Sequence, residues 1–403
     1  MQNVFNTLER RGYVEQLTHP EEIKKLFEKE CVPFYIGIDP TADSLHVGHF
    51  ISLMVASHMQ KAGHKPIILM GGGTAIIGDP SGKTDMRKML TVEDIDSNVA
   101  QIKKQIEKFL RFDGPNAAII VNNGDWLRDL NYINFMREIG VHFSVNRMLA
   151  AECYKNRLET GLTFFELGYM LMQSYDFLYL HDHYGCKLEM GGNDQWSNII
   201  GGVELIRKIG AEDAYGFTFK LLTTKEGKKM GKTEKGALWL NPEKTSPYEF
   251  YQYWRNVADD DIENVMKLLT FIDVDEIEEM TKYKDERINE AKRRAAFEIT
   301  KLVHGEEAAI KAEEATKAMF EGKGNVEAME STKVEVGCTI TEALVNAGIA
   351  PSKGQAKTLI SQGAISLNDE KIDDIAYVLK EEDFKEGYAI LRKGKKIYHK
   401  LTK

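Results

Sequence analysis

Short apolar segments that alternate with long helical stretches constrain the fold of this chain more than any other feature. Residues 32–38, 66–70, 117–121 and 186–191 predict buried strands. Longer stretches with helical periodicity separate them. Strands that alternate with helices predict an α/β fold with a parallel sheet that carries helices on both faces.

The pattern changes after the α/β part. From Ser246-Pro247, which with Glu249 forms a capping box, helical periodicity continues to about residue 320. Residues 321–332 offer little to bury and predict a linker. A small unit follows, with predicted helices at 341–347 and 352–362 and strands at 364–367 and 387–391. We therefore expect an α/β domain over 1–228, a helical domain over 229–320, a linker over 321–335 and a small α+β domain over 336–403.

Composition excludes several protein classes. With 43% hydrophobic and 29% charged residues, the chain is typical of a soluble globular protein. It has no apolar run long enough to span a membrane, and its first residues carry charges where a signal peptide has an apolar core. The four cysteines form no CxxC pair, which favours reduced thiols over disulfides or a zinc site. We expect a cytoplasmic protein.

Charge is unevenly distributed along the chain. Residues 333–403 carry 12 basic and 10 acidic side chains, whereas the rest carries 41 and 52. The last dozen residues, 392–403, hold six basic side chains and no acidic one. This basic end could bind a polyanion, or it could only keep the terminus soluble.

A strand-loop-helix segment with two histidines follows the first predicted strand. Residues 37–49 read GIDPTADSLHVGH, and we expect a helix that begins near Ser44 and ends at Gly63. Ligands of α/β proteins bind at this edge of the sheet, near a helix N-terminus. His46 and His49 would share one face of the first turn, and Gly48 would leave room for a flat group such as a purine. The pair could bind phosphate, form half of a metal site or simply begin a helix.

Glycines also follow the second predicted strand. Residues 71–84 (GGGTAIIGDPSGKT) suggest a phosphate-binding P-loop, but Gly78 and Gly82 have three residues between them where that motif has four. Pro80 also removes an amide that would donate to phosphate. The segment instead predicts a turn that presents Asp79 at the end of a strand, where a carboxylate can bind an ammonium group.

The segment from Phe164 to Leu180 predicts a buried helix because it is almost wholly apolar. Tyr169, Gln173 and Asp176 fall on one stripe of that helix. A buried carboxylate is costly unless it is paired, so Asp176 needs a partner. The stripe could be an internal network with neighbouring tyrosines, or a polar pocket for a small ligand with both an amine and a hydroxyl group.

Two further segments present polar side chains in loops. Residues 191–196 (GGNDQW) follow a predicted strand, and their glycines would let a ribose approach the backbone near Asp194 and Gln195. Residues 228–233 (KKMGKT) place Lys229 and Lys232 three residues apart. Such lysines could close over phosphates and neutralise developing charge, or they could simply be solvated.

Together these segments resemble the class I aminoacyl-tRNA synthetases. PTADSLHVGH (40–49) is similar to that family's HIGH signature, and KMGKT (229–233) is similar to its KMSKS loop, with glycine and threonine in place of two serines. YIGIDPTADSLHVGH, GDPSGK, YMLMQSYDF and GGNDQW narrow the resemblance to the bacterial tyrosyl-tRNA synthetase family. The C-terminal SKGQAKTLISQGAISLNDEKI looks like an S4-type RNA-binding domain, which that family also carries.

The resemblance implies a Rossmann-like catalytic domain, an α-helical domain and an S4-like domain, and it implies roles for individual residues. The substrate tyrosine would be held at its phenol by Tyr35 and Asp176, and at its α-amino group by Tyr169, Gln173 and Asp79. The nucleotide would be bound by Gly37, Asp39, His46, Gly48, His49, Gly192, Asp194, Gln195 and Lys232, with Gln195 also near the tyrosine carboxylate. The reacting phosphates would be contacted by Thr41, His46, His49, Lys83, Arg87, Lys229, Lys232 and Thr233. The tRNA would be contacted by Arg207, Lys208, Lys353, Lys357, Arg392, Lys393, Lys395 and Lys396.

The implied activity is a ligation in two steps. L-tyrosine and ATP would give tyrosyl-adenylate, and the tyrosyl group would then pass to the 3′ end of tRNA(Tyr). Mg²⁺ would arrive with ATP, and we expect neither a protein metal site nor a tightly bound cofactor. Because the family is homodimeric, a homodimer is expected, with neither membrane nor DNA as a partner.

Three other functions stay open. Tryptophanyl-tRNA synthetases share both signatures but normally lack the S4-like unit, and Tyr35 with Asp176 disfavours tryptophan. An RNA-binding protein on a synthetase scaffold would not need the HIGH-like and KMSKS-like residues, which this chain keeps. A nucleotidyltransferase with the same histidine pattern would have no use for an RNA-binding unit.

Overall fold

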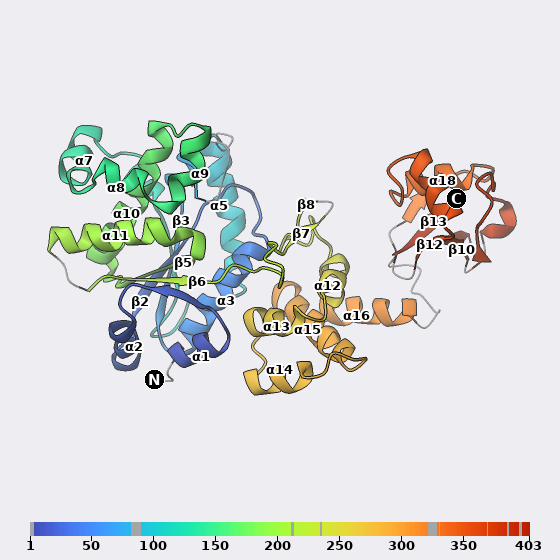
Figure 1. Ribbon diagram of the computed structural model, residues 1–403, viewed down its shortest axis with the longest axis horizontal. Helices are drawn as coiled ribbons and strands as arrows, with labels where there is room; N and C mark the ends of the chain where they lie inside the picture. Colours follow the sequence, from blue (N-terminus) through green and yellow to red (C-terminus); the bar gives the residue numbers. More distant parts are fainter. Residues whose placement is uncertain are drawn as a thin grey trace. The chain divides into compact units, whose positions relative to one another are not determined.

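The computed structural model describes residues 4–81, 90–210, 213–233, 236–320, 329, 331–368, 370–384, 387–394 and 397–403. The chain divides into two compact units, Met1–Ala312 and Glu313–Lys403. Each unit is described by itself below (Figure 1).

A six-stranded sheet with the strand order β1-β6-β5-β2-β3-β4 organises the first unit. Four strands lie where the sequence predicts them: β2 (Pro33–Ile38), β3 (Lys65–Met70), β4 (Ile119–Asn122) and β5 (Leu188–Gly192). The sequence did not reveal β1 (Val14–Leu17) and β6 (Tyr215–Phe219). All neighbouring strands pair in parallel except β1, which runs antiparallel to β6 at one edge. The predicted α/β fold is confirmed.

Helices cover both faces of this sheet, because alternate side chains of its buried strands point to opposite sides. Phe34 and Ile68 belong to the core shared with α3 (Val47–Lys61). Tyr35 and Ile67 belong to the core shared with α10 (Phe164–Tyr184) and α11 (Trp196–Ile209). Figure 1 shows α3 on one side of the strands and α10 with α11 on the other.

The other helices of this region are short, apart from α5. They are α1 (Val4–Arg10), α2 (Pro20–Lys29), α4 (Thr74–Ile77), α5 (Val92–Ile106), α6 (Gly124–Leu127), α7 (Tyr132–Glu138), α8 (Val145–Leu149) and α9 (Glu152–Thr160), with the 3-10 turns η1 (Gly140–His142) and η2 (Asn193–Gln195).

Helices dominate the chain after the sheet, as predicted. They are α12 (Pro247–Arg255), α13 (Ile262–Leu269), α14 (Val274–Thr281), α15 (Ile288–His304) and α16 (Glu306–Phe320). The predicted capping box begins α12: the Glu249 amide donates to Ser246 Oγ at 3.2 Å, and the Ser246 amide donates to the Glu249 carboxylate at 3.1 Å. Before this region, β7 (Lys232–Thr233) and β8 (Gly236–Ala237) pair as a small antiparallel sheet.

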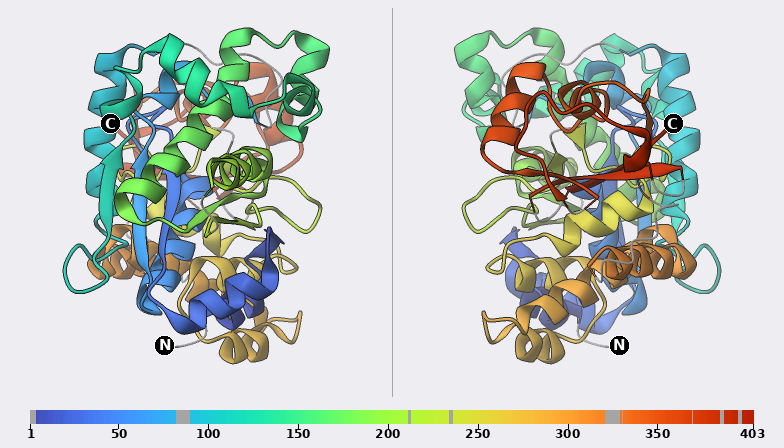
Figure 2. Two further views of the ribbon diagram at one scale, coloured as in Figure 1. Left: turned by 90° about the vertical axis from the view of Figure 1, so that its left-hand side faces the viewer. Right: turned by 90° about the vertical axis from the view of Figure 1, so that its right-hand side faces the viewer.

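The second unit has its own sheet and its own core. Its strand order is β11-β10-β12-β13-β9, built from β9 (Ser331–Lys333), β10 (Ile365–Leu367), β11 (Glu370–Lys371), β12 (Tyr388–Lys393) and β13 (Ile397–Thr402). The helices are α17 (Ile340–Asn346) and α18 (Lys353–Ser361), with the 3-10 turn η3 (Glu381–Asp383). Figure 2 shows this unit in red, with its helices beside the strands.

One part of the predicted linker belongs to this second sheet. Residues 331–333 form β9, which pairs in parallel with β13 through the pairs Ser331–Lys400 and Thr332–Leu401. The segment offers no buried apolar run, so its strand conformation depends on the partner strand rather than on its own sequence. Residues 321–328 and 330 of the predicted linker lie outside the described residues.

Candidate active site

A cavity of about 730 Å³ opens at the carboxyl ends of the parallel strands of the first unit. Its walls include Asn123 and Glu189, which the sequence did not single out. The sequence-predicted residues that line it are Tyr35, Gly37, Asp39, Thr41, His46, Gly48, His49, Asp79, Tyr169, Gln173, Asp176, Gly192, Asp194, Gln195 and Lys229. The fold therefore brings most of the predicted site residues together.

The two histidines of the HIGH-like segment form the start of α3. This helix begins at Val47, not near Ser44 as expected, and ends at Lys61, close to Gly63. The reason is that His46 is the N-cap: its Nδ1 accepts from the Gly48 amide at 3.0 Å, and His49 Nδ1 accepts from the His46 amide at 3.3 Å. This is a capping box made of two imidazoles rather than a serine and a glutamate.

The geometry of this pair decides which ring nitrogen can serve a ligand. The two rings stack with centroids 4.1 Å apart. Because each Nδ1 accepts a backbone hydrogen bond, the neutral form of each ring carries its proton on Nε2. Both histidines can therefore donate from Nε2 to an anion. Gly48 serves the same arrangement, since a Cβ atom there would lie 2.7 Å from His46 Cε1.

Asp176 lies at the base of the cavity and is 1% exposed. The required partners are not tyrosines: Asn123 Nδ2 and Trp126 Nε1 donate to its two carboxylate oxygens, both at 2.8 Å. Burial raises the pKa of Asp176 well above its usual range, and these two hydrogen bonds oppose that shift. The Tyr35 hydroxyl, equally buried, makes no hydrogen bond of standard geometry within the described residues, where the Glu189 carboxylate lies near it. A hydroxyl-bearing ligand would give it such a bond.

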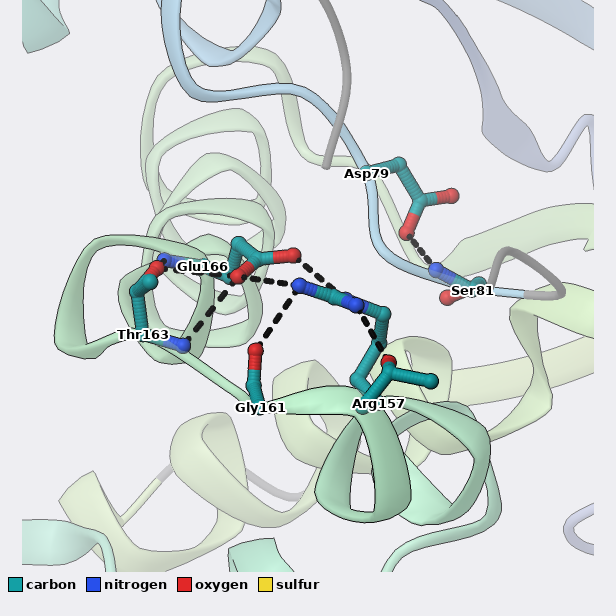
Figure 3. A network of polar contacts seen from close by, with 7 residues as sticks. Asp79, Ser81, Arg157, Gly161, Thr163 and Glu166 are labelled. Atoms are coloured by element: carbon teal, nitrogen blue, oxygen red, sulfur yellow. Dashed lines mark hydrogen bonds and ion pairs between the residues drawn. The ribbon is translucent and has the colours of Figure 1, made fainter. Parts of the chain in front are cut away.

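A chain of polar contacts joins the middle of the cavity. Tyr169 Oη donates to Asp39 Oδ2 at 2.9 Å, and Thr74 Oγ1 donates to Asp39 Oδ1 at 2.8 Å. Asp79 accepts from the Ser81 amide at 2.9 Å (Figure 3) and from Gln195 Nε2 at 2.7 Å. The Asp79 side chain thus closes a local turn with Ser81, but this turn follows the short helix α4 and not a strand as the sequence predicted.

The backbone that follows the KMSKS-like loop pairs with the HIGH-like segment. The Val47 amide donates to Leu238 O at 3.0 Å, and the Leu240 amide donates to Leu45 O at 2.8 Å. Lys229 Nζ lies 3.9 Å from Asp194 Oδ2 at the cavity wall. Residues 238–240, which follow the KMSKS-like loop, thus pair with the HIGH-like segment, and the Leu238 amide donates to Gly231 O of the loop at 2.8 Å. Lys229 of that loop lines the same cavity as His46 and His49.

Glycine at position 231 has a structural reason. Its φ angle is +81°, and a Cβ atom there would lie 3.1 Å from Val47 Cβ. The Gly231 amide donates to Tyr253 Oη at 2.7 Å, which ties the loop to α12. A serine at this position would be strained in this backbone conformation. The departure from the family's serine therefore matches the conformation of this loop.

The remaining predicted site residues either are not described or do not line the cavity. Lys83 and Arg87 lie outside the described residues, as do Lys395 and Lys396, and the side chains of Lys232 and Thr233 are not described. Arg207 and Lys208, at the end of α11, pair with Glu204 (2.8 Å) and with His142 O (2.7 Å). Lys353 pairs with Glu342 (2.9 Å), Arg392 and Lys393 contact Ser366 (3.5 Å) and Ile349 O (3.2 Å), and Lys357 is exposed. None of these six lines the cavity.

Sequence reasoning missed Asn123, Trp126 and Glu189. Asn123 lies two residues beyond the predicted strand 117–121 and directly after β4, and that position at the carboxyl end of a parallel strand could have marked it. Glu189 is an acidic residue inside an apolar strand, which is also a readable signal. No sequence signal marked Trp126, because its indole is recognisable as a partner of Asp176 only in the folded chain.

Comparison with known proteins identifies the family. Residues 28–321 match the model of tRNA synthetases class I (W and Y), and residues 321–401 match that of the tyrosine–tRNA ligase SYY-like C-terminal domain. The chain therefore belongs to the class I tRNA synthetases.

Individual relatives narrow the family to its tyrosine-specific members. The chain is 60% identical to the tyrosine–tRNA ligase of Clostridium perfringens (strain 13 / Type A) over 406 residues, covering 100% of both chains. It is 58% identical over 402 residues to that of Caldanaerobacter subterraneus subsp. tengcongensis, covering 99% of both. A C-terminally truncated mitochondrial tyrosyl-tRNA synthetase of Aspergillus nidulans has a similar structure, with a TM-score of 0.72 and 28% identity over 79% of this chain and 95% of that one.

The described residues contain no helix that is long and apolar enough to cross a membrane. They also contain no group of three or more His, Cys, Asp or Glu side chains that could hold a metal ion. All four cysteines are free.

Proposed function

We propose that this protein is a tyrosine–tRNA ligase, which activates L-tyrosine with ATP and transfers the tyrosyl group to the 3′ end of tRNA(Tyr). One observation carries the choice of amino acid. The buried Tyr35 hydroxyl and the Asp176 carboxylate both line the base of a cavity whose rim holds paired histidines. A phenol fits that base, and phosphates fit that rim. The tyrosine–tRNA ligases that resemble the chain from end to end support the same reaction.

The residues of the cavity divide by chemistry. Tyr35 and Asp176 hold the phenol, while Asp79, Tyr169 and Gln173 hold the ammonium group. The adenylate lies along Gly37, Asp39, Gly192, Asp194 and Gln195. The phosphates are contacted by Thr41, His46, Gly48, His49 and Lys229, joined by Lys83, Arg87, Lys232 and Thr233.

The reaction needs no nucleophilic side chain. The tyrosine carboxylate attacks the α-phosphorus of ATP in line, one new P–O bond forms, and the bond to pyrophosphate breaks. The Nε2–H groups of His46 and His49 and the Lys229 ammonium group stabilise the charge that moves onto pyrophosphate. In the second step the terminal ribose hydroxyl of tRNA attacks the carbonyl carbon and AMP leaves. Mg²⁺ enters as part of the ATP substrate complex.

The direct test is ATP–pyrophosphate exchange with tyrosine, phenylalanine and tryptophan in parallel. We expect exchange with tyrosine only. Exchange driven by tryptophan would instead assign the chain to the tryptophan enzymes of the same family. A protein without exchange but with RNA affinity would be a binding protein on a synthetase scaffold.

The C-terminal domain serves tRNA charging rather than tyrosine activation. We expect a chain that ends at about residue 325 to keep exchange within about twofold, because all cavity residues precede it. Charging of tRNA should fall at least about tenfold, because phosphate contacts dominate affinity for nucleic acids. The measurement compares exchange and aminoacylation in both forms at matched salt. Full charging by the shorter chain would contradict the RNA-binding assignment.

A second copy of this chain covers an exposed apolar face of the first unit. Here named the α7–α10 face, it is the surface of residues 132–164, where large apolar side chains are exposed, including Tyr132, Ile133, Val141, Val145, Leu158 and Phe164. Phe164 is 71% exposed, yet its backbone is fixed. Arg157 pairs with Glu166 at 2.8 Å, and Thr163 caps the helix through the Glu166 amide at 3.2 Å (Figure 3). A rigid, exposed apolar face of this kind is typical of a subunit interface.

Phe164→Asp should therefore convert a homodimer to monomers. Because a two-fold interface repeats each contact, two buried charges replace two buried rings, and we expect the dimer dissociation constant to rise at least about 100-fold. Sedimentation over a concentration series measures it. Phe112→Asp is the matched control, since Phe112 is 40% exposed but lies outside the α7–α10 face. Equal sedimentation of wild type and Phe164→Asp as dimers would refute this interface.

The free cysteines and the use of tRNA fit a cytoplasmic enzyme.

A further inference from the structure

Glu189 is a buried carboxylate in the wall of the cavity to which the proposed reaction gives no role. It lies in β5 and is 1% exposed. Its parallel register partner in β2 is Tyr35, so both side chains point to the same face of the sheet. That face is the one covered by α10, which carries Gln173 and Asp176. Glu189 therefore lies among the residues assigned to tyrosine recognition.

Glu189 makes a hydrogen bond to one member of this group, and its carboxylate also lies near the Tyr35 hydroxyl. Gln173 Nε2 donates to Glu189 Oε1 at 2.9 Å. An ionised carboxylate only accepts hydrogen bonds, so the end of the glutamine amide that faces it must be the NH₂ group. The carbonyl oxygen, Gln173 Oε1, must then point away from Glu189.

That carbonyl oxygen is buried and has no hydrogen-bond partner among the described residues. An unpaired buried acceptor is costly unless a ligand supplies a donor. The α-ammonium group of an amino acid carries three donors and needs acceptors. With the opposite amide orientation, Gln173 would present its NH₂ group to the ammonium group, which is a repulsive contact.

We propose that Glu189 is a positioning residue for amino-acid recognition: by accepting from the Gln173 amide, it aims the Gln173 carbonyl oxygen at the substrate ammonium group. The inference rests on the proposed function and deepens it. It assigns to an acidic residue in the wall a part in recognising the amine, without any contact between that residue and the reacting atoms.

This role has a consequence for pH. Burial raises the pKa of Glu189 to about 7, opposed by its contacts with Tyr35 and Gln173. Three titratable groups face Glu189: the Tyr35 hydroxyl from β2, the Asp176 carboxyl from α10 and the thiol of Cys186, which lies just before β5. Protonation gives Glu189 an O–H donor, so the amide is no longer held in one orientation. Tyrosine should bind more weakly as the pH falls through about 7.

The test measures equilibrium binding of tyrosine and of two analogues, each lacking one group. Desaminotyrosine, 3-(4-hydroxyphenyl)propionate, lacks the ammonium group, and tyramine lacks the carboxylate. The variants are Glu189→Met, which has similar length and no acceptor oxygen, and Glu189→Gln, which keeps an acceptor but does not ionise. KM for ATP in the exchange reaction and thermal unfolding are measured alongside.

For Glu189→Met we expect about tenfold weaker binding of tyrosine and of tyramine, with desaminotyrosine and the KM for ATP within about twofold of wild type. Glu189→Gln carries a donor as well as an acceptor, like protonated Glu189, so it should bind tyrosine about as wild type does below pH 7 and should lose the change in affinity near pH 7. Equal losses for desaminotyrosine and tyrosine would overturn the proposal, because they would indicate a general disturbance of the pocket. So would a Glu189→Met variant that binds tyrosine as tightly as wild type. Wild-type protein that shows no tyrosine-dependent exchange would refute the proposed function instead, and that result is read before any variant.

Discussion

Phenylalanine should support ATP–pyrophosphate exchange about 10⁴- to 10⁵-fold less efficiently than tyrosine, a range for which tyrosyl-tRNA synthetases are themselves the standard example. The reason lies at the base of the cavity. Phenylalanine would offer the buried Tyr35 hydroxyl no hydrogen bond and would place a ring edge against Asp176. Each buried polar group left unpaired costs about 1–3 kcal/mol. The measurement is kcat/KM for each amino acid in the exchange reaction.

A pair of matched substitutions assigns this effect to one hydroxyl. Tyr35→Phe should lower kcat/KM for tyrosine about tenfold or more and leave that for phenylalanine nearly unchanged. Tyr13→Phe is the control: Tyr13 is also fully buried, but its hydroxyl donates to Leu268 O and it does not line the cavity. Its substitution should leave the ratio between the two amino acids unaltered. Wild-type enzyme that activates both amino acids equally would disprove the pocket assignment.

The second large effect concerns the phosphate end of the cavity. His49→Ala and Lys229→Ala should each slow tyrosyl-adenylate formation about 10²- to 10³-fold, the usual cost of removing one charge-stabilising donor. Tyrosine affinity should change less than about twofold, since these groups act on charge that develops only as pyrophosphate leaves. Single-turnover adenylate formation and equilibrium tyrosine binding separate the two quantities.

The loop supplies its own control. Lys228 is next to Lys229 in the sequence, but it is 78% exposed, pairs with Glu226 and does not line the cavity. Lys228→Ala should therefore leave adenylate formation within about twofold of wild type. If Lys229→Ala lost tyrosine affinity in parallel with rate, or if the two lysine variants behaved alike, the proposed role of Lys229 would be wrong.

Local patterns were sufficient for much of this molecule. The buried strands β2, β3, β4 and β5 were predictable because each is a short apolar run, and α12 because Ser246 and Glu249 cap it within one turn. The need of Asp176 for a partner also followed from its position in an apolar helix. Signals of this kind depend on neighbours within a few residues, so a single sequence contains them. The HIGH-like and KMSKS-like segments identified the family for the same reason.

Other features of the fold and the site depend on contacts between segments that are distant in the sequence. Strands β1, β6 and β9 lie at or near sheet edges, and their conformation depends on the strand beside them. The partners of Asp176 come from about 50 residues away in the chain, a separation over which no periodicity carries information. The pairing of Val47 with Leu238, and the orientation that Glu189 imposes on Gln173, likewise exist only in the folded chain. Local sequence patterns identified most of the side chains that could do the chemistry, whereas the orientation of these side chains depends on packing between segments that are distant in the chain.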